Sequence, residues 1–119
     1  MRNFTSERKI PMITEVAFFY INEGMEVRFE KDFAVVAQET IALSKGYIAH
    51  TLHKCIETEG KYMVQVEWET LEDHMEGFVG SDLFKEWVKK MDHYFKPNIY
   101  MEHYQLIKYF ERGAKTEGR

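Results

Sequence analysis

His74 is the residue of this chain best suited to acid–base chemistry. It follows Thr70-Leu71-Glu72-Asp73, in which Thr70 and Asp73 have the spacing of a helix start. Leu71 and Phe78 lie three residues before and four residues after His74, so helical winding puts the three side chains on one inward face. An imidazole in a pocket could take a proton from a phenol or an enol. The alternative is a core or helix-end histidine that is hydrogen-bonded to the backbone.

Three further residues could take part in proton transfer or bind a substrate. Trp68 ends a strand-like run and is either a core residue or part of a site. Glu15 and Glu67 fall inside runs that are otherwise apolar, and a buried carboxylate has a raised pKa and can act as a base. The simpler interpretation is that each carboxylate pairs with a basic residue of a second chain or is exposed at a strand end.

The remaining histidines and the single cysteine do not predict a metal site. His50 and His53 are three residues apart on a predicted strand, so they face opposite sides of it. His93 and His103 have no partner at the spacing of metal ligands. Cys55 is the only cysteine, which excludes an intrachain disulfide and a CxxC motif. We predict neither a metal nor a cofactor.

Composition narrows the class of protein. The chain of 119 residues has room for one domain, and its aromatic share of 15% indicates a large core, a subunit interface or an apolar pocket. The net charge of −4, without a basic stripe, argues against nucleic acid as a partner. No apolar run approaches the ~20 residues of a membrane span, and the first twelve residues lack the apolar centre of a signal peptide. We expect a cytoplasmic protein that binds no membrane.

The apolar periodicity changes between period two and helical spacing along the chain. It predicts four strands, at Met12–Ile21, Tyr47–Ile56, Lys61–Trp68 and Asn98–Ile107. A helix is expected from Met25 to the stop at Gly46, and a short one after Thr70 that Gly77 and Gly80 interrupt. A further helix begins at Ser81 and ends before Pro97, with Trp87 on its apolar face.

This order predicts an α+β fold, the ferredoxin-like split βαβ sandwich (βαββαβ) with an antiparallel four-stranded sheet. We expect one domain at residues 12–107, a flexible lead-in at 1–11 and a charged tail at 108–119. Two main helices cover only one face of such a sheet, yet several strands are apolar on both faces. A second copy of the chain would cover the other face, so we expect a homodimer.

Three stretches resemble the antibiotic biosynthesis monooxygenase (ABM) domain. They are Gly46-Tyr47 at the start of the second strand, the run from Trp68 to His74, and Ser81-Asp82-Leu83-Phe84. The resemblance covers about Met12 to Leu106. It implies a dimeric α/β barrel with a small-molecule pocket between the sheet and the helices of each protomer. Members of that family include cofactor-independent oxygenases of polycyclic phenols, haem-degrading oxygenases and small-metabolite enzymes.

The haem-degrading members do not match this chain at their functional positions. Their asparagine, tryptophan and iron-binding histidine correspond to Ala17, to Gly77 or Phe78, and to Val88. Iron needs a nitrogen or sulfur donor, and Val88 offers none. Haem degradation is therefore not expected.

The phenol-oxidising members match in part. They keep a tryptophan that corresponds to Trp68, and an asparagine and a tyrosine that correspond to Val64 and His74. The resemblance implies His74 and Trp68 as catalytic residues. The expected pocket walls are Val64, Leu71, Phe78 and Trp87.

Three functions stay open at the level of sequence. The first is a cofactor-independent monooxygenase acting on a phenolic or enolic compound, with His74 as the acid–base group. The second is a non-catalytic dimeric module that binds a small apolar or phenolic molecule. The third is a small-metabolite isomerase or detoxifying enzyme on the same scaffold.

Overall fold

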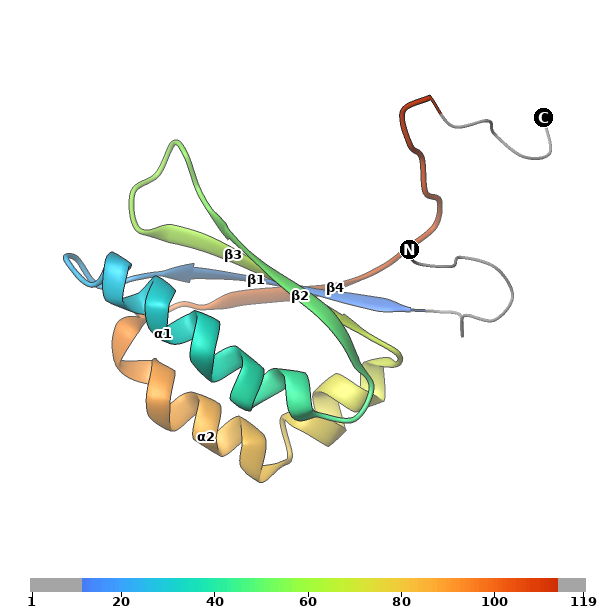
Figure 1. Cartoon of the computed structure of the whole chain (residues 1–119), viewed down its shortest axis with the longest axis horizontal. Coiled ribbons are helices and arrows are strands. Elements are labelled where there is room, and N and C mark those ends of the chain that lie inside the picture. The colour runs from blue at the N-terminus through green and yellow to red at the C-terminus, as the bar shows by residue number, and fades with distance from the viewer. Residues whose placement is uncertain (1–11, 114–119) are drawn as a thin grey trace.

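A four-stranded antiparallel sheet organises the chain, and α1 and α2 lie against one of its faces (Figure 1). The computed structural model describes residues 12–113, so the predicted lead-in at 1–11 and residues 114–119 of the predicted tail lie outside the described residues. The strands are ordered β2-β3-β1-β4 across the sheet. Their bounds are β1 Ile13–Tyr20, β2 Tyr47–Lys54, β3 Lys61–Trp68 and β4 Tyr100–Gln105.

Two α-helices and three short helical segments connect these strands. The helices are α1 Glu26–Glu39 and α2 Asp82–Met91, and the short segments are η1 Ile41–Leu43, η2 Asp73–Phe78 and η3 Asp92–Tyr94. The order of strands and helices confirms the predicted α+β, ferredoxin-like fold. No helix among residues 12–113 is long and apolar enough to cross a membrane.

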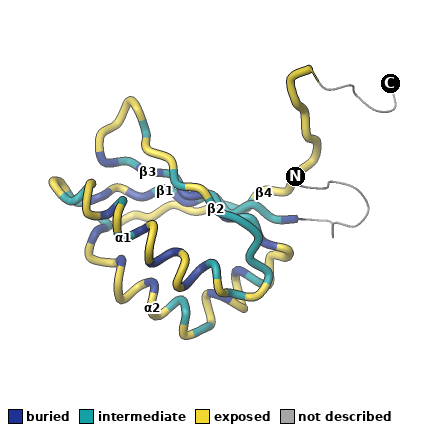
Figure 2. The backbone as a smooth tube through the Cα atoms, viewed as in Figure 1, coloured by how far each residue is buried: buried dark blue, intermediate teal, exposed yellow. Residues whose placement is uncertain are grey.

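The core lies between the sheet and the helices. Alternate residues of β3 point toward the helices, and Tyr62, Val64, Val66 and Trp68 are all buried. The helices contribute a second layer of buried rings and chains, namely Phe29, Phe33, Trp87 and Met91. Figure 2 shows the same pattern, with buried positions on the sides of the helices that face the sheet. Full burial of each large apolar side chain stabilises the fold by about 1.5–3 kcal/mol.

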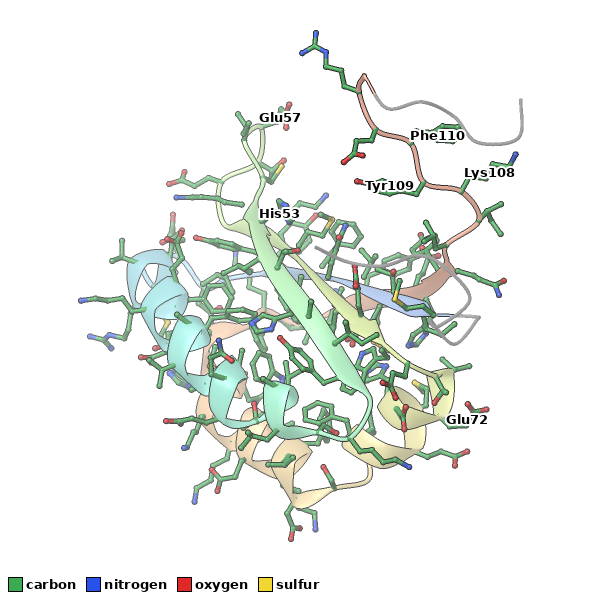
Figure 3. All side chains as sticks on the ribbon, turned by 45° about the vertical axis from the view of Figure 1, so that its right-hand side comes forward. His53, Glu57, Glu72, Lys108, Tyr109 and Phe110 are labelled. Atoms are coloured by element: carbon green, nitrogen blue, oxygen red, sulfur yellow. The ribbon has the colours of Figure 1, made fainter. Side chains whose placement is uncertain are left out.

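The opposite face of the sheet has no helix on it among residues 12–113 (Figure 1). The rings of Phe18 and Tyr100 lie 6.3 Å apart, from neighbouring strands on this face. Tyr100 and Tyr104 are each about half exposed. Beyond β4 the chain leaves the sheet as an extended arm, in which Ile107 and Phe110 are exposed (Figures 1 and 3).

Several element ends differ from the prediction, and three of them have a clear local reason. The fourth strand begins at Tyr100 rather than Asn98, because Asn98 has a positive φ of 74°. The second strand ends at Lys54, and Ile56 is 94% exposed in the hairpin. The first helix ends at Glu39, where the Thr40 hydroxyl donates to the Val36 carbonyl at 2.7 Å and a 3₁₀ turn follows.

The turn at Gly46 connects the start of β2 to the segment that carries His74. Gly46 has a φ of +84°, in the left-handed region, and its carbonyl accepts from the Glu69 amide at 2.8 Å. A Cβ at this position would lie 2.1 Å from the Asp73 carboxyl and 2.6 Å from its Cβ. The backbone of one loop therefore packs directly against the first residue of η2, which only glycine permits.

We expect Gly46→Ala to lower the free energy of unfolding more than Gly24→Ala does. Gly24 has the same φ of +84° but nothing within 4 Å of its would-be Cβ, so it isolates the backbone strain of about 1–2 kcal/mol. The collision with Asp73 should add about 1–3 kcal/mol for Gly46→Ala. Urea unfolding of both variants measures the difference, and equal losses would show that η2 does not press against this turn.

Candidate functional site

A cavity of about 380 Å³ lies between the sheet and the helical layer. This volume falls within the range of about 300–1,000 Å³ that is usual for small-molecule sites. Three polar residues, Glu15, His74 and Asp92, contribute to its lining. The other lining residues are apolar: Ala17, Phe19, Ile41, Val64, Val66, Met75, Phe78, Val79, Phe84, Trp87, Val88, Phe95, Ile99 and Met101.

His74 lies on the short helix η2 and is 3% exposed. Both of its ring nitrogens have a partner. Nε2 lies 3.3 Å from Oε1 of Glu15, and Nδ1 lies 2.8 Å from Nε2 of His103. The imidazole is thus held between a carboxyl group on β1 and a second imidazole on β4.

Trp68 contacts both His74 and Glu15. It is fully buried, and its indole ring stacks on the His74 imidazole with a centroid distance of 5.2 Å and an angle of 20°. Its indole N–H donates to Oε1 of Glu15 at 3.0 Å. Trp68 therefore fixes both the imidazole and the carboxyl group, although it is not among the residues that line the cavity.

Burial moves the pKa values of the carboxyl group and the imidazole in opposite directions. Desolvation raises the pKa of Glu15 to about 7, against the lowering effect of the hydrogen bond from Trp68. Desolvation, with a smaller contribution from His103, lowers the pKa of His74 to about 4. At neutral pH the imidazole is uncharged and the carboxyl group is close to its titration midpoint. Glu15 is therefore the better matched of the two to accept a proton at that pH.

Sheet register explains why residues so far apart in the sequence meet here. Glu15 is paired with His103 on one side and with Val66 on the other. Residues that are directly opposite share a face, and Trp68 lies two positions beyond Val66 on that same face. These side chains therefore all point toward the helices, where η2 supplies His74.

η2 is wound as a π-helix, in which the Val79 amide donates to the His74 carbonyl at 3.0 Å. The predicted start signal is present, since the Asp73 amide donates to the Thr70 hydroxyl at 3.0 Å. Such short π segments are frequent at functional sites. The wider winding directs His74 and Phe78 inward together, and both are buried.

The residues that the sequence singled out divide into three groups. His74, Val64, Phe78 and Trp87 line the cavity, and Trp68 lies behind it. Leu71 lies outside the lining and is 41% exposed. Its predicted position assumed α-helical spacing, which the π-helical winding that begins at Asp73 does not keep.

Sequence reasoning missed His103 and gave too little weight to Glu15. The sequence offers His103 no partner at the spacing of metal ligands, but in the fold its Nε2 lies 2.8 Å from Nδ1 of His74. Only the pairing of β1 with β4 brings it there, and that register is not visible in either strand alone. The one available signal is that Glu15 is a charged residue inside a run that is otherwise largely apolar.

The other histidines of the sheet behave as the spacing indicates. His50 faces the helices, with its ring 5.9 Å from Phe33 and its Nδ1 2.5 Å from the Tyr47 hydroxyl. His53 is exposed on the hairpin side of β2 (Figure 3). Among residues 12–113, no group of three or more His, Cys, Asp or Glu side chains is placed to hold a metal ion.

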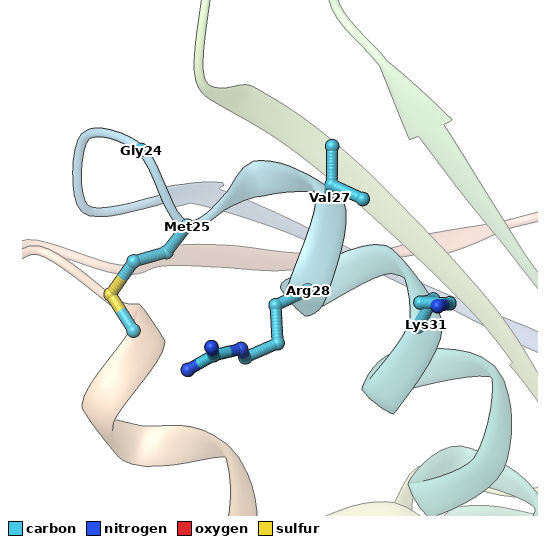
Figure 4. Close-up of a pocket in the computed structure, with 5 residues that line it drawn as sticks. All are labelled: Gly24, Met25, Val27, Arg28 and Lys31. Atoms are coloured by element: carbon cyan, nitrogen blue, oxygen red, sulfur yellow. The ribbon is translucent and has the colours of Figure 1, made fainter.

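A second hollow lies at the beginning of α1 and is open to solvent. It is lined by Gly24, Met25, Val27, Arg28 and Lys31 (Figure 4). The Arg28 and Lys31 side chains extend in different directions and do not converge on one point. The cavity beside His74 is therefore the better candidate for a functional site.

The ferredoxin-like sheet-and-helix fold and the cavity between its two layers define the class of protein, a small α+β domain with an internal cavity. Residues 12–90 match the family "Antibiotic biosynthesis monooxygenase" (ABM). The chain belongs to this family.

Individual relatives extend the match. The chain is 46% identical over 96 residues to the uncharacterised protein YczJ of Bacillus subtilis, covering 81% of this chain and all of that one. A crystal structure from Bordetella bronchiseptica, provisionally assigned as an antibiotic biosynthesis monooxygenase, is 31% identical with a TM-score of 0.77, over 82% of this chain and 99% of that one. SnoaB, a cofactor-independent oxygenase from Streptomyces nogalater, shares the fold at 17% identity and a TM-score of 0.62, over 87% of this chain and 99% of its own.

The raised pKa of Glu15 predicts how its contribution to stability changes with pH. Its pKa is about 7 in the folded chain, above the ordinary value of 4.5, so between these two pH values the folded state binds more protons than the unfolded state. Stability from this group is therefore lost as pH rises from 4.5 to 7. Glu15→Gln keeps an acceptor for Trp68 and should become progressively more stable than wild type across that window.

Urea unfolding at a series of pH values measures this difference. Glu57→Gln, on the exposed hairpin between β2 and β3, is the matched control (Figure 3). A pH-independent difference between Glu15→Gln and wild type would mean that the carboxyl group is not held protonated by burial.

Proposed function

We propose that this protein is a cofactor-independent monooxygenase that oxidises a neutral phenolic or enolic compound. The observation that carries the proposal is the contact between His74 and Glu15 at one wall of an otherwise apolar cavity. His74 serves as an acid–base group in contact with that carboxyl group. Membership in the ABM family supports oxygen chemistry, and the resemblance of the fold to the cofactor-independent SnoaB supports a reaction without a resident cofactor.

The chemistry needs a base and a dry environment. Removal of a proton from an enolisable methylene gives an electron-rich anion, which passes one electron to dioxygen. The substrate radical and superoxide combine to a peroxide, and loss of water from the peroxide leaves a carbonyl, so that CH₂ and O₂ become C=O and H₂O. The two hydrogens of the methylene end in the water. The apolar wall around the site protects the intermediates from solvent.

The charge of the cavity supports a neutral ligand. Its titratable lining residues are Glu15, His74 and Asp92, and neither lysine nor arginine occurs among its lining residues within 12–113. An anionic ligand would meet acidic groups without a compensating cation, which is costly in an apolar site. A phenol or an enol is uncharged on entry and donates a hydrogen bond to the carboxyl group.

Oxygen uptake with 1,8-dihydroxyanthrone tests the function, because this neutral compound is phenolic and has an enolisable methylene. The wild-type protein should consume oxygen and form the quinone without added metal, flavin or reductant. His74→Ala should lower turnover by about 10²–10⁴, the usual value of acid–base catalysis. His53→Gln, an exposed histidine on β2, is the control and should keep full activity.

Two outcomes would contradict the proposal. Tight binding of the compound without oxygen uptake would favour a non-catalytic binding module. Equal turnover per folded molecule in His74→Ala and wild type would remove the acid–base role of the imidazole. Thermal melts of the same preparations separate loss of chemistry from loss of folded protein.

We also propose that the protein is a homodimer, formed through the sheet face that carries no helix. Phe18 and Tyr100 lie on this face, and the arm beyond β4 adds exposed Ile107 and Phe110. The ammonium group of Lys61 lies 5.3 Å from the centre of the Phe18 ring and partly covers it. A stable interface of this kind should bury more than about 1,200 Å² in total.

Light scattering at micromolar concentration should give the mass of two chains. Tyr100→Glu, which places a charge on the proposed interface, should weaken the dimer by about tenfold or more. Ile56→Glu is the matched control, because Ile56 is 94% exposed at the tip of the hairpin. A monomer mass for the wild-type protein would overturn the dimer.

A further inference from the structure

Three side chains form a continuous row of close polar contacts from the cavity to the edge of the sheet. Glu15 and His74 line the cavity, and Oε1 of Glu15 lies 3.3 Å from Nε2 of His74. Nδ1 of His74 lies 2.8 Å from Nε2 of His103. His103 is half-buried and lies on β4, which is an edge strand. The row therefore begins at a ligand site and ends where the sheet meets solvent.

The contacts Glu15–His74 and His74–His103 can each have either residue as the donor. The charge of Glu15 decides which arrangement of donors satisfies both contacts. When the carboxyl group is neutral, it donates to Nε2 of His74, and Nδ1–H of His74 donates to Nε2 of His103. When it is ionised, Nε2–H of His103 donates to Nδ1 of His74, and Nε2–H of His74 donates to the carboxylate. Reversal of both bonds transfers the carboxyl proton to Nε2 of His74 and the Nδ1 proton of His74 to Nε2 of His103, and His103 returns to its neutral form when its own Nδ1–H leaves for water.

We propose that Glu15, His74 and His103 form one proton path, in which Glu15 takes the proton of the bound compound and the two imidazoles pass it to solvent at the edge of β4. The proposal rests on the proposed function and assigns the acceptor and the exit of its proton. Glu15 and His74 both line the cavity and are the catalytic residues: Glu15 accepts the proton of the substrate, and His74 exchanges it with Glu15. His103 is a positioning residue, which acts only through His74.

Over a full turnover, the three side chains gain and lose the same number of protons. A proton leaves the substrate for the carboxylate, crosses to Nε2 of His74 while Nδ1 releases its own to His103, and leaves His103 for water. When the peroxide loses water, a proton moves from solvent through His103 and His74 back to Glu15 and on to the peroxide. The path needs no oxidant or reductant beyond the substrate and dioxygen.

The surroundings favour a path of neutral groups. The titratable side chains that face Glu15 are His74 from η2 and His103 from β4, and Asp92 reaches the cavity from η3. Burial lowers the pKa values of both imidazoles, that of His74 to about 4, and so favours their neutral forms. Trp68 stacks on His74 and donates to Oε1 of Glu15, which keeps the heavy atoms fixed while the protons move.

Nitrogen NMR of the ligand-free protein tests the path directly, because it reports which ring nitrogen carries the proton. As pH is raised through the titration of Glu15, the proton of His74 should change from Nδ1 to Nε2, while the ring stays neutral. In His103→Gln this change should be lost or shifted in pH, because a carboxamide cannot accept a proton and release another. His53→Gln, on the exposed part of β2, should behave as wild type. A His74 tautomer that stays fixed across the Glu15 titration would overturn the proposal.

Turnover of 1,8-dihydroxyanthrone gives the second readout. His103→Gln should lower kcat by about tenfold, less than the 10²–10⁴ expected for the acid–base group itself, with KM unchanged. Added imidazole buffer should restore the rate, which a merely structural role would not allow. A rate that is insensitive to buffer in the variant would overturn the exit at His103. Failure of the wild-type protein to oxidise the compound would overturn the proposed function, whereas the tautomer change would still decide the path.

Discussion

The burial of one carboxyl group determines how the rest of the site is built. Glu15 lies on β1, which has a strand on each side, and its side chain is 13% exposed. An unpartnered carboxyl group at such a place would cost several kcal/mol. The indole N–H of Trp68 and the imidazole of His74 supply its partners. The strand pairing, the ring stack and the inward turn of η2 can all be understood as means of keeping this group satisfied.

The same arrangement explains why the cavity is apolar elsewhere. Three of the lining residues are polar, and two of these, Glu15 and His74, contact each other. The rest of the wall consists of apolar side chains from the sheet and from the helical layer. A site of this kind has little capacity to stabilise a charge that a ligand brings with it. It is better suited to create a charge in place, by moving a proton over a short distance, than to bind one from solution.

Local patterns in the sequence were sufficient for the fold but not for the site. Alternation along β3 and the caps at Thr70 and Ser81 are properties of neighbouring residues, and each of them is present in the structure. His74 and Phe78 could be assigned to the cavity for the same reason. The partnership of Glu15 with His103 depends on which strands are neighbours and in what register, so no window of sequence contains it. Leu71 shows a second limit, since its predicted place assumed α-helical spacing up to His74, which lies in the π-helical segment that begins at Asp73.

The π-helical winding of η2 has a consequence for how this site could change over evolutionary time. A π turn holds more residues than an α turn, so the distance along the chain from Trp68 to Ser81 includes length that an α-helical connection would not need. Loss of a single residue between Trp68 and His74 would rotate His74 by roughly 100° about the helix axis. Every residue of the site could remain in the sequence while the imidazole left the carboxyl group. The number of residues in this connection is therefore as much a determinant of the chemistry as the identity of the histidine.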